Sequence, residues 1–261
     1  MRPLAVAHLT ALDLAPVDLV REAARAGFSA VGLRLHPVLP GATAYPVASG
    51  SPAARELKTV LAGEGVQVGD IEFVSLTPQF RLGDHEGLLA AGADLGASSL
   101  TVSGDDLDHA RLVHNYASLC ELANGYGLRV DLEFMRWRAV ANLQQAVAVV
   151  TGAGQGNAGV LVDALHLYRS GGDEQAVAQV DPQYLRAVQL CDAPRSPPPE
   201  DLIIQEAREG RLLPGQGALP LEALLGVLPT HVAVSVETPS RLLTNSDRLV
   251  AAYQATRLLN Y

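Results

Sequence analysis

The sequence is poor in cysteine and lysine and has no long apolar run. Cys120 and Cys191 are its only cysteines and lie far apart. Because residues 1–10 carry no secretory pattern, we expect no disulfide framework and a cytoplasmic location. The one lysine, Lys58, lies in a segment typical of a helix, which argues against Schiff-base chemistry. No stretch approaches the roughly 18 apolar residues that span a membrane, so we expect no membrane association.

The chain also lacks clustered positive charge. It has 19 Lys and Arg against 28 Asp and Glu, a formal net charge of −9. A polyanion needs grouped cations, so nucleic acid is not an expected partner and a small-molecule substrate is. Hydrophobic residues make up 48% of the 261 residues, enough for one large core. We therefore expect a single domain over residues 1–261.

Eight short apolar runs rich in β-branched residues alternate with longer segments of helical pattern. This alternation is typical of β/α units on a parallel sheet, and about 33 residues per unit fits an eight-fold (β/α)8 TIM barrel. The expected strands are residues 4–9, 30–35, 66–74, 98–103, 129–134, 159–163, 187–191 and 232–237.

A doubly wound open sheet is the alternative fold. Its dinucleotide-binding form needs a glycine-rich turn between the first strand and the first helix, and this chain has none there. The one G-x-G-x-x-G match, at residues 154–159, precedes a strand where the dinucleotide fingerprint must follow one. The sequence therefore favours the barrel.

A long connection follows the seventh expected strand. Residues 192–218 are too long for a simple link, and Pro197, Pro198 and Pro199 would stiffen its beginning. Loops after the strands form the active-site face of a TIM barrel, so we expect a long loop that contributes to the site. A surface excursion without function is the alternative, and whether the loop is a lid stays open.

Four successive expected strands end in a side chain that carries an oxygen: Glu133, Asp163, Gln189 and Glu237. Each alone could be a helix cap or an exposed charge. In a closed barrel the ends of the strands converge, and three crowded carboxylates repel one another unless a cation neutralises them. Three carboxylates and an amide oxygen are hard ligands, which favours Mn²⁺ or Mg²⁺ and leaves Zn²⁺ or Co²⁺ as alternatives.

These residues and their surroundings resemble the sugar isomerase/epimerase branch of the xylose isomerase-like TIM barrels. The strongest pieces are VLVDALHLYRSGG, AVQLCDAPR and SVETP. In tagatose and psicose epimerases the metal is held by Glu, Asp, His and Glu, with a second His three residues after the Asp and an Arg six residues after the metal His. The resemblance therefore implies metal binding by Glu133, Asp163, Gln189 and Glu237, and substrate binding by His166 and Arg195.

Two positions depart from the epimerase pattern. Gln189 stands where the epimerases have His, as in hydroxypyruvate isomerases, which carry Gln in a similar context. Its amide oxygen is a weaker donor than imidazole, so we expect looser metal binding. Ala139 stands where the epimerases place a Glu near the substrate. The resemblance therefore does not imply a strict ketose 3-epimerase.

The reaction implied by the resemblance is proton transfer beside a carbonyl group. A metal polarises a small hydroxy-carbonyl substrate, and Glu133 and Glu237 act as acid and base to isomerise or epimerise it. A dehydratase of the inosose or dehydroshikimate type is the main alternative. An apurinic-site nuclease is disfavoured by Gln189 and the negative charge, and a binding barrel without catalysis is a further alternative.

Three other residues lie near the expected strand ends. Trp137, the only tryptophan, is predicted to form an aromatic wall over the substrate, with core packing as an equal alternative. For Arg34 and Glu72 we favour an ion pair over contact with substrate.

Relatives of this kind often form dimers or tetramers, so a homo-oligomer is expected as well.

Overall fold

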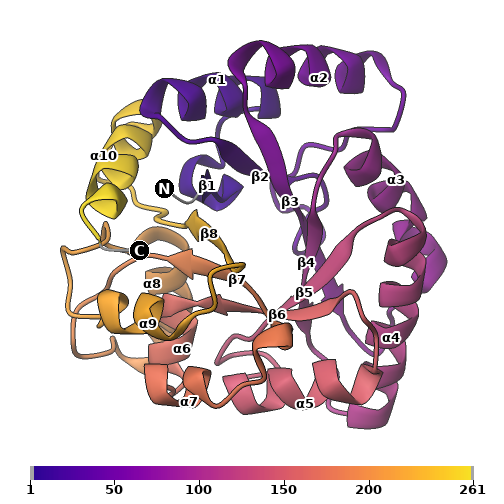
Figure 1. Ribbon diagram of the computed structural model, residues 1–261, viewed down its shortest axis with the longest axis vertical. Helices are drawn as coiled ribbons and strands as arrows, with labels where there is room; N and C mark the ends of the chain where they lie inside the picture. Colours follow the sequence, from indigo (N-terminus) through magenta and orange to yellow (C-terminus); the bar gives the residue numbers. More distant parts are fainter. Residues whose placement is uncertain (1–2, 260–261) are drawn as a thin grey trace.

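The computed structural model describes residues 3–259 and shows a closed barrel of parallel strands in the order β1 to β8, with β8 paired to β1 (Figure 1). This confirms the (β/α)8 prediction. The strands are β1 Leu4–Val6, β2 Ala30–Arg34, β3 Gln67–Leu76, β4 Ser99–Gly104, β5 Arg129–Glu133, β6 Ala158–Asp163, β7 Leu185–Leu190 and β8 Ala233–Val236.

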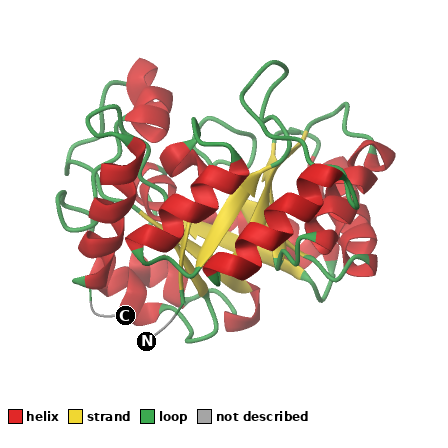
Figure 2. Cartoon of the chain, turned by 90° about the horizontal axis from the view of Figure 1, so that it is seen from above, coloured by secondary structure: helices red, strands yellow, loops and turns green. Residues whose placement is uncertain are grey.

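Helices surround the strands on the outside of the barrel, as Figure 2 shows. The α-helices are α1 Pro16–Ala26, α2 Pro52–Glu64, α3 Glu86–Asp94, α4 His109–Gly125, α5 Leu143–Ala153, α6 Ala164–Arg169, α7 Glu174–Ala178, α8 Ile203–Glu209, α9 Leu221–Val227 and α10 Asn245–Arg257. Short 3-10 turns lie at η1 His8–Ala11, η2 Leu82–His85, η3 Pro182–Tyr184 and η4 Glu200–Leu202. Within residues 3–259, no helix has both the length and the apolar character needed to cross a membrane.

The first strand is shorter than predicted. The sequence predicts a strand to residue 9, but β1 ends at Val6 and the chain turns into η1. Side chains of η1 accept hydrogen bonds that a longer β1 would have accepted through its backbone. The Arg34 amide donates to His8 Nδ1 at 2.8 Å, and the Thr238 amide donates to Thr10 Oγ1 at 3.0 Å. Side-chain hydrogen bonds thus tie this segment to the ends of β2 and β8.

The segment after β7 is more ordered than predicted. We expected one long loop over residues 192–218, but it contains η4 and the helix α8. The apolar residues Ile203 and Ala207 are spaced by four, lie on one face of α8 and are buried. This helix carries the chain back over the C-terminal ends of the strands.

The interior of the barrel is polar at its N-terminal end. A cavity of about 120 Å³ there is lined by Asp70, Thr101, Asp131 and Gln189, among others. Burial, with the nearby charge of Glu72, raises the pKa of Asp70 to about 8, although Thr101 Oγ1 donates to its Oδ2 at 3.2 Å. The environment of Asp70 therefore favours the protonated carboxyl.

Asp70 makes folding stability depend on pH. A carboxyl whose pKa is raised on folding binds more protons in the folded than in the unfolded chain, so its contribution to stability falls as pH rises from about 4 to about 8. We expect Asp70→Asn to gain stability relative to the wild type over this range, by at most about 1.4 kcal/mol per pH unit. Urea unfolding at several pH values measures the difference. The exposed control Asp201→Asn should run parallel to the wild type, and parallel curves for Asp70→Asn would refute the assignment.

Candidate active site

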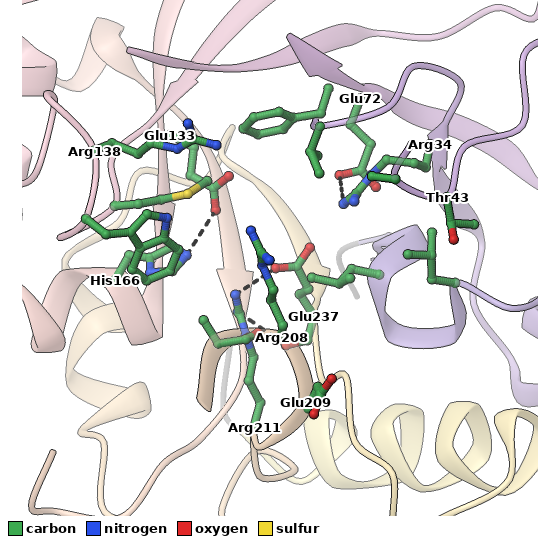
Figure 3. Close-up of a pocket in the computed structure, with 18 residues that line it drawn as sticks. Arg34, Thr43, Glu72, Glu133, Arg138, His166, Arg208, Glu209, Arg211 and Glu237 are labelled. Carbon is green, nitrogen blue, oxygen red and sulfur yellow. Dashed lines mark hydrogen bonds and ion pairs between the residues drawn. The ribbon is translucent and has the colours of Figure 1, made fainter. Parts of the chain in front are cut away.

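A cavity of about 290 Å³ opens at the C-terminal ends of the strands, where the sequence places the site (Figure 3). Side chains from β2, β3, β5, α6 and the α8 region line it, together with Glu237 just after β8. Its charged and titratable lining residues are Arg34, Glu72, Glu133, Arg138, His166, Arg208, Glu209, Arg211 and Glu237.

Three side chains of types that bind metals come together at this end of the barrel, and two of them line the cavity. Glu133, Asp163 and His166 each offer a ligand atom, and these atoms lie within 4.8 Å of one another. Glu133 Oε1 lies 3.7 Å from His166 Nε2. Carboxylate oxygens and an imidazole nitrogen are a donor set that divalent cations accept, so the residues present fit a metal site.

The spacing between Asp163 and His166 has a local cause. Asp163 is the last residue of β6 and the N-cap of α6, where its Oδ1 accepts the His166 amide at 2.9 Å. This cap starts a helix directly at the strand end, one that the sequence analysis did not predict. The first turn of α6 then places His166 beside the carboxylate.

Glu237 and Gln189 complete the four strand-end positions, but they face different spaces. Glu237 lines the main cavity. Gln189 lies deeper, lines the interior cavity, and donates from Nε2 to Glu237 Oε1 at 3.5 Å. Its buried Oε1 has no hydrogen-bond partner in the described part of the chain. An unpaired buried carbonyl of this kind is an available ligand, so metal binding by Gln189 stays a prediction.

Arg211 pairs with two of the expected metal ligands. The sequence analysis did not predict these contacts. Arg211 Nη1 donates to Asp163 Oδ2 at 2.5 Å and its Nη2 to Glu237 Oε2 at 2.9 Å. The side chain is almost fully buried. Arg211 therefore joins the carboxylates at the ends of β6 and β8.

The carboxylates of the site differ in their protonation. Burial raises the pKa of Glu133 well above its ordinary value, and the charges of Glu237 and Asp163 raise it further. Burial also raises the pKa of Glu237, to about 7, although Arg211 opposes the shift. For Asp163, the opposing effects of Arg211 and His166 outweigh burial and lower the pKa. Of these three carboxylates, burial favours the protonated form of Glu133 and Glu237, and the neighbouring cation favours the ionised form of Asp163.

His166 is neutral in this environment. Burial lowers the pKa of His166 to about 4, although Asp163 acts in the opposite direction. The indole of Trp137 packs edge-on against its ring, with centroids 5.1 Å apart, and lines the same cavity. Trp137 also packs against the buried cluster that contains Leu165 and Ala207, so the aromatic wall and core packing both stay open. A neutral imidazole held this way can ligate a metal or donate to a substrate oxygen.

Two other arginines had expected roles, and the structure places one of them as expected. Arg195 is exposed and does not line the cavity, so its role in binding substrate stays a prediction that this geometry does not support. Arg34 forms the ion pair that we favoured, with its Nη2 2.8 Å from Glu72 Oε2, and both side chains are buried. The α8 region supplies Arg208 and Arg211 to the cavity instead.

Comparison with known proteins gives relatives that are enzymes. The 3-dehydroshikimate dehydratase of Pseudomonas aeruginosa is 31% identical over 163 residues, which are 62% of this chain and 25% of that protein. The inosose isomerase of Bacillus velezensis is 30% identical over 113 residues, which are 42% of this chain and 38% of that protein. The chain thus spans about a quarter to two fifths of the length of these curated relatives.

The fold is shared with solved structures along the whole chain. The crystal structure of the IolI protein with a bound zinc atom has a TM-score of 0.79 and 20% identity to this chain, and the match covers 98% of this chain and 96% of that one. A family model described as xylose isomerase-like TIM barrel matches residues 20–258. The chain therefore belongs to the xylose isomerase-like TIM barrel family.

Proposed function

We propose that the protein is a metal-dependent isomerase or epimerase of a small hydroxy-carbonyl compound, a ketose, a sugar derivative or a keto-acid. One observation carries the proposal: Glu133 from β5 and Glu237 from the end of β8 face the same cavity, with His166 beside Glu133. Two carboxylates on separate walls can exchange protons with neighbouring carbons of one bound molecule. The inosose isomerase among the relatives supports this class of reaction.

The residues that would hold the metal are Glu133, Asp163 and Glu237, with Gln189 or His166 as a further ligand. A bound divalent ion would polarise the substrate carbonyl and make the neighbouring carbon-bound proton more acidic. The oxygen-rich set favours Mn²⁺ or Mg²⁺. Zn²⁺ is a further candidate, because the IolI structure contains a bound zinc atom.

The side chains of this protein divide the remaining work. One of Glu133 and Glu237 removes the proton from the carbon beside the carbonyl, and the other returns a proton to the same or the adjacent carbon. Neutral His166 donates a hydrogen bond to a substrate oxygen. Trp137 covers the apolar face of the substrate and excludes water from that side. The cavity of about 290 Å³ limits the substrate to a small molecule.

A dehydratase acting on a carboxylated substrate is the second candidate, and the dehydratase among the relatives favours it. Arg208 lines the cavity and, among residues 3–259, has no ion-pair or hydrogen-bond partner for its guanidinium. Such a group suits a substrate carboxylate. A Glu would then take the proton beside the carbonyl, the C–OH bond at the next carbon would break, and a C=C bond and water would form. The dehydratase from Pseudomonas aeruginosa supports this alternative.

Proton exchange in D₂O tests both candidates. We would load the protein with Mn²⁺ and follow ketoses, inososes, hydroxypyruvate and 3-dehydroshikimate by NMR, with and without EDTA. Solvent deuterium in an isomerised product, lost with EDTA, supports the isomerase, whereas an unsaturated product supports the dehydratase. In the second case Arg208→Gln should raise KM for the carboxylated substrate by about tenfold or more. Metal-loaded protein that gives no exchange or elimination with any of them would refute the proposal.

A further inference from the structure

The guanidinium of Arg211 lies where it joins two members of the candidate ligand set. It contacts Asp163 through Nη1 at 2.5 Å and Glu237 through Nη2 at 2.9 Å. Asp163 itself does not line the main cavity, whereas Arg211 does. Arg211 thus lines the cavity and also contacts the Asp163 carboxylate, and Figure 3 shows Arg211 beside Glu237.

The backbone around Arg211 fixes this position. Residue 212 forms a two-way antiparallel bridge with Asp192, with N–O distances of 2.9 and 2.8 Å. The Asp192 carboxylate accepts the amides of Gly215 and Leu219. At Gly217 a Cβ would lie 2.3 Å from Asp192 Oδ1, so only glycine allows this approach. These hydrogen bonds therefore hold the segment that carries Arg211 against the C-terminal end of β7.

The guanidinium is also well satisfied by hydrogen bonds. Its Nε donates to the Ala207 carbonyl at 2.8 Å, in the last turn of α8. With its contacts to Asp163 and Glu237, every nitrogen of the guanidinium has a partner. A buried guanidinium with this many hydrogen bonds and ion pairs is held in one position by its partners.

The side-chain amide of Gln189 is oriented toward Glu237, one of the two carboxylates that Arg211 contacts. Its amide nitrogen points at Glu237, and its Oε1 has no partner. Binding a metal through Oε1 requires the amide to turn, which would set its oxygen toward the Glu237 carboxylate. Two oxygens meet there only if a cation lies between them.

We propose that Arg211 and a divalent cation compete for Asp163 and Glu237, so that Arg211 sets the metal affinity of the site. A doubly charged ion held by these carboxylates would stand a few ångströms from the guanidinium, in a buried place where repulsion is poorly screened. Metal binding therefore displaces the guanidinium toward the cavity that Arg211 already lines, where it becomes available to an anionic substrate. This inference rests on the metal-binding part of the proposed function and not on the reaction.

Titration with Mn²⁺ alone tests the competition, with free Mn²⁺ measured by electron paramagnetic resonance. We expect Arg211→Gln to bind Mn²⁺ at least about tenfold more tightly than the wild type, because no guanidinium has to be displaced. The matched control is Arg208→Gln, which removes the same charge from the same cavity without touching the ligands. We expect its Kd to stay within about twofold of the wild type. Arg211→Lys keeps a cation but loses the paired contacts, so its affinity should lie between those of the wild type and Arg211→Gln.

Thermal unfolding keeps the test decisive if Arg211→Gln folds poorly. In EDTA this variant should melt below the wild type, and Mn²⁺ should raise its Tm by more than it raises the wild-type Tm. Equal or weaker Mn²⁺ binding by Arg211→Gln, equal tightening by Arg208→Gln, or no Mn²⁺ binding by any variant would overturn the competition. The proposed reaction is tested separately, since it fails only if metal-loaded wild-type protein does not act on a substrate.

Discussion

Replacing Glu133 or Glu237 by glutamine is expected to lower the rate of substrate proton exchange by about 10²- to 10⁴-fold. Glutamine preserves the size of the side chain and one oxygen that can still bind a cation, but it cannot take up and return a proton. Both glutamates face the cavity, and both have a pKa raised by burial. Exchange of the carbon-bound hydrogen in D₂O, followed by NMR, measures the effect.

Metal content separates the two roles that these glutamates are proposed to have. If the variant proteins retain as much Mn²⁺ as the wild type, the lost rate belongs to proton transfer and not to a missing ligand. The exposed Glu200, paired with Arg136 on the surface, provides the control Glu200→Gln, which should exchange at the wild-type rate. Exchange within about tenfold of the wild type in both cavity variants would remove Glu133 and Glu237 as acid and base.

The buried pair of Arg34 and Glu72 is expected to give the largest single effect on stability. Replacing Arg34 by methionine leaves the Glu72 carboxylate buried with no opposing charge. Only 7% and 4% of the two side chains are exposed. Losing one partner of a buried ion pair typically lowers the free energy of unfolding by about 3–5 kcal/mol. Urea unfolding at neutral pH measures the loss.

A double variant tests the cause of that loss. Arg34→Met combined with Glu72→Met removes both charges and should recover most of the stability, because two apolar side chains carry no desolvation penalty. Glu72 Oε1 and Arg34 Nε have no hydrogen-bond partner within residues 3–259, so the pair has no extended network to lose. If Arg34→Met alone lowers the free energy of unfolding by less than about 1 kcal/mol, the prediction is wrong and water in the cavity solvates Glu72.

The fold could be predicted because its signal is repeated. Each strand is a short apolar run that ends near a polar residue, and eight repeats fix the barrel even where single boundaries are wrong. The C-terminal ends of parallel strands in a closed barrel must converge, so Glu133, Asp163 and Glu237 could be expected near one another. Their side chains do lie around the same site.

Arg211 could not be placed from the sequence, because no local pattern determines where it lies. Its position depends on α8 folding back over the barrel and on the bridge between residues 192 and 212. Arg195 illustrates the same limit. Its expected role came from its distance along the chain after Gln189, but the path of a loop is set by its own contacts, and Arg195 is exposed outside the cavity lining. At this site, residues at the strand ends or a few positions after them, such as Trp137 and His166, could be expected from the sequence, whereas residues on the long segment after β7 could not.

The double role of Asp163 has an evolutionary consequence. One of its oxygens accepts the amide that starts α6 and the other accepts from Arg211, so under the proposed function a single side chain would serve both the architecture and the chemistry. A descendant that abandoned the reaction would still need a helix-starting residue here, and asparagine, serine or threonine would serve. Sequences of this family that have lost activity should therefore drift at position 163 toward those residues and seldom toward apolar ones.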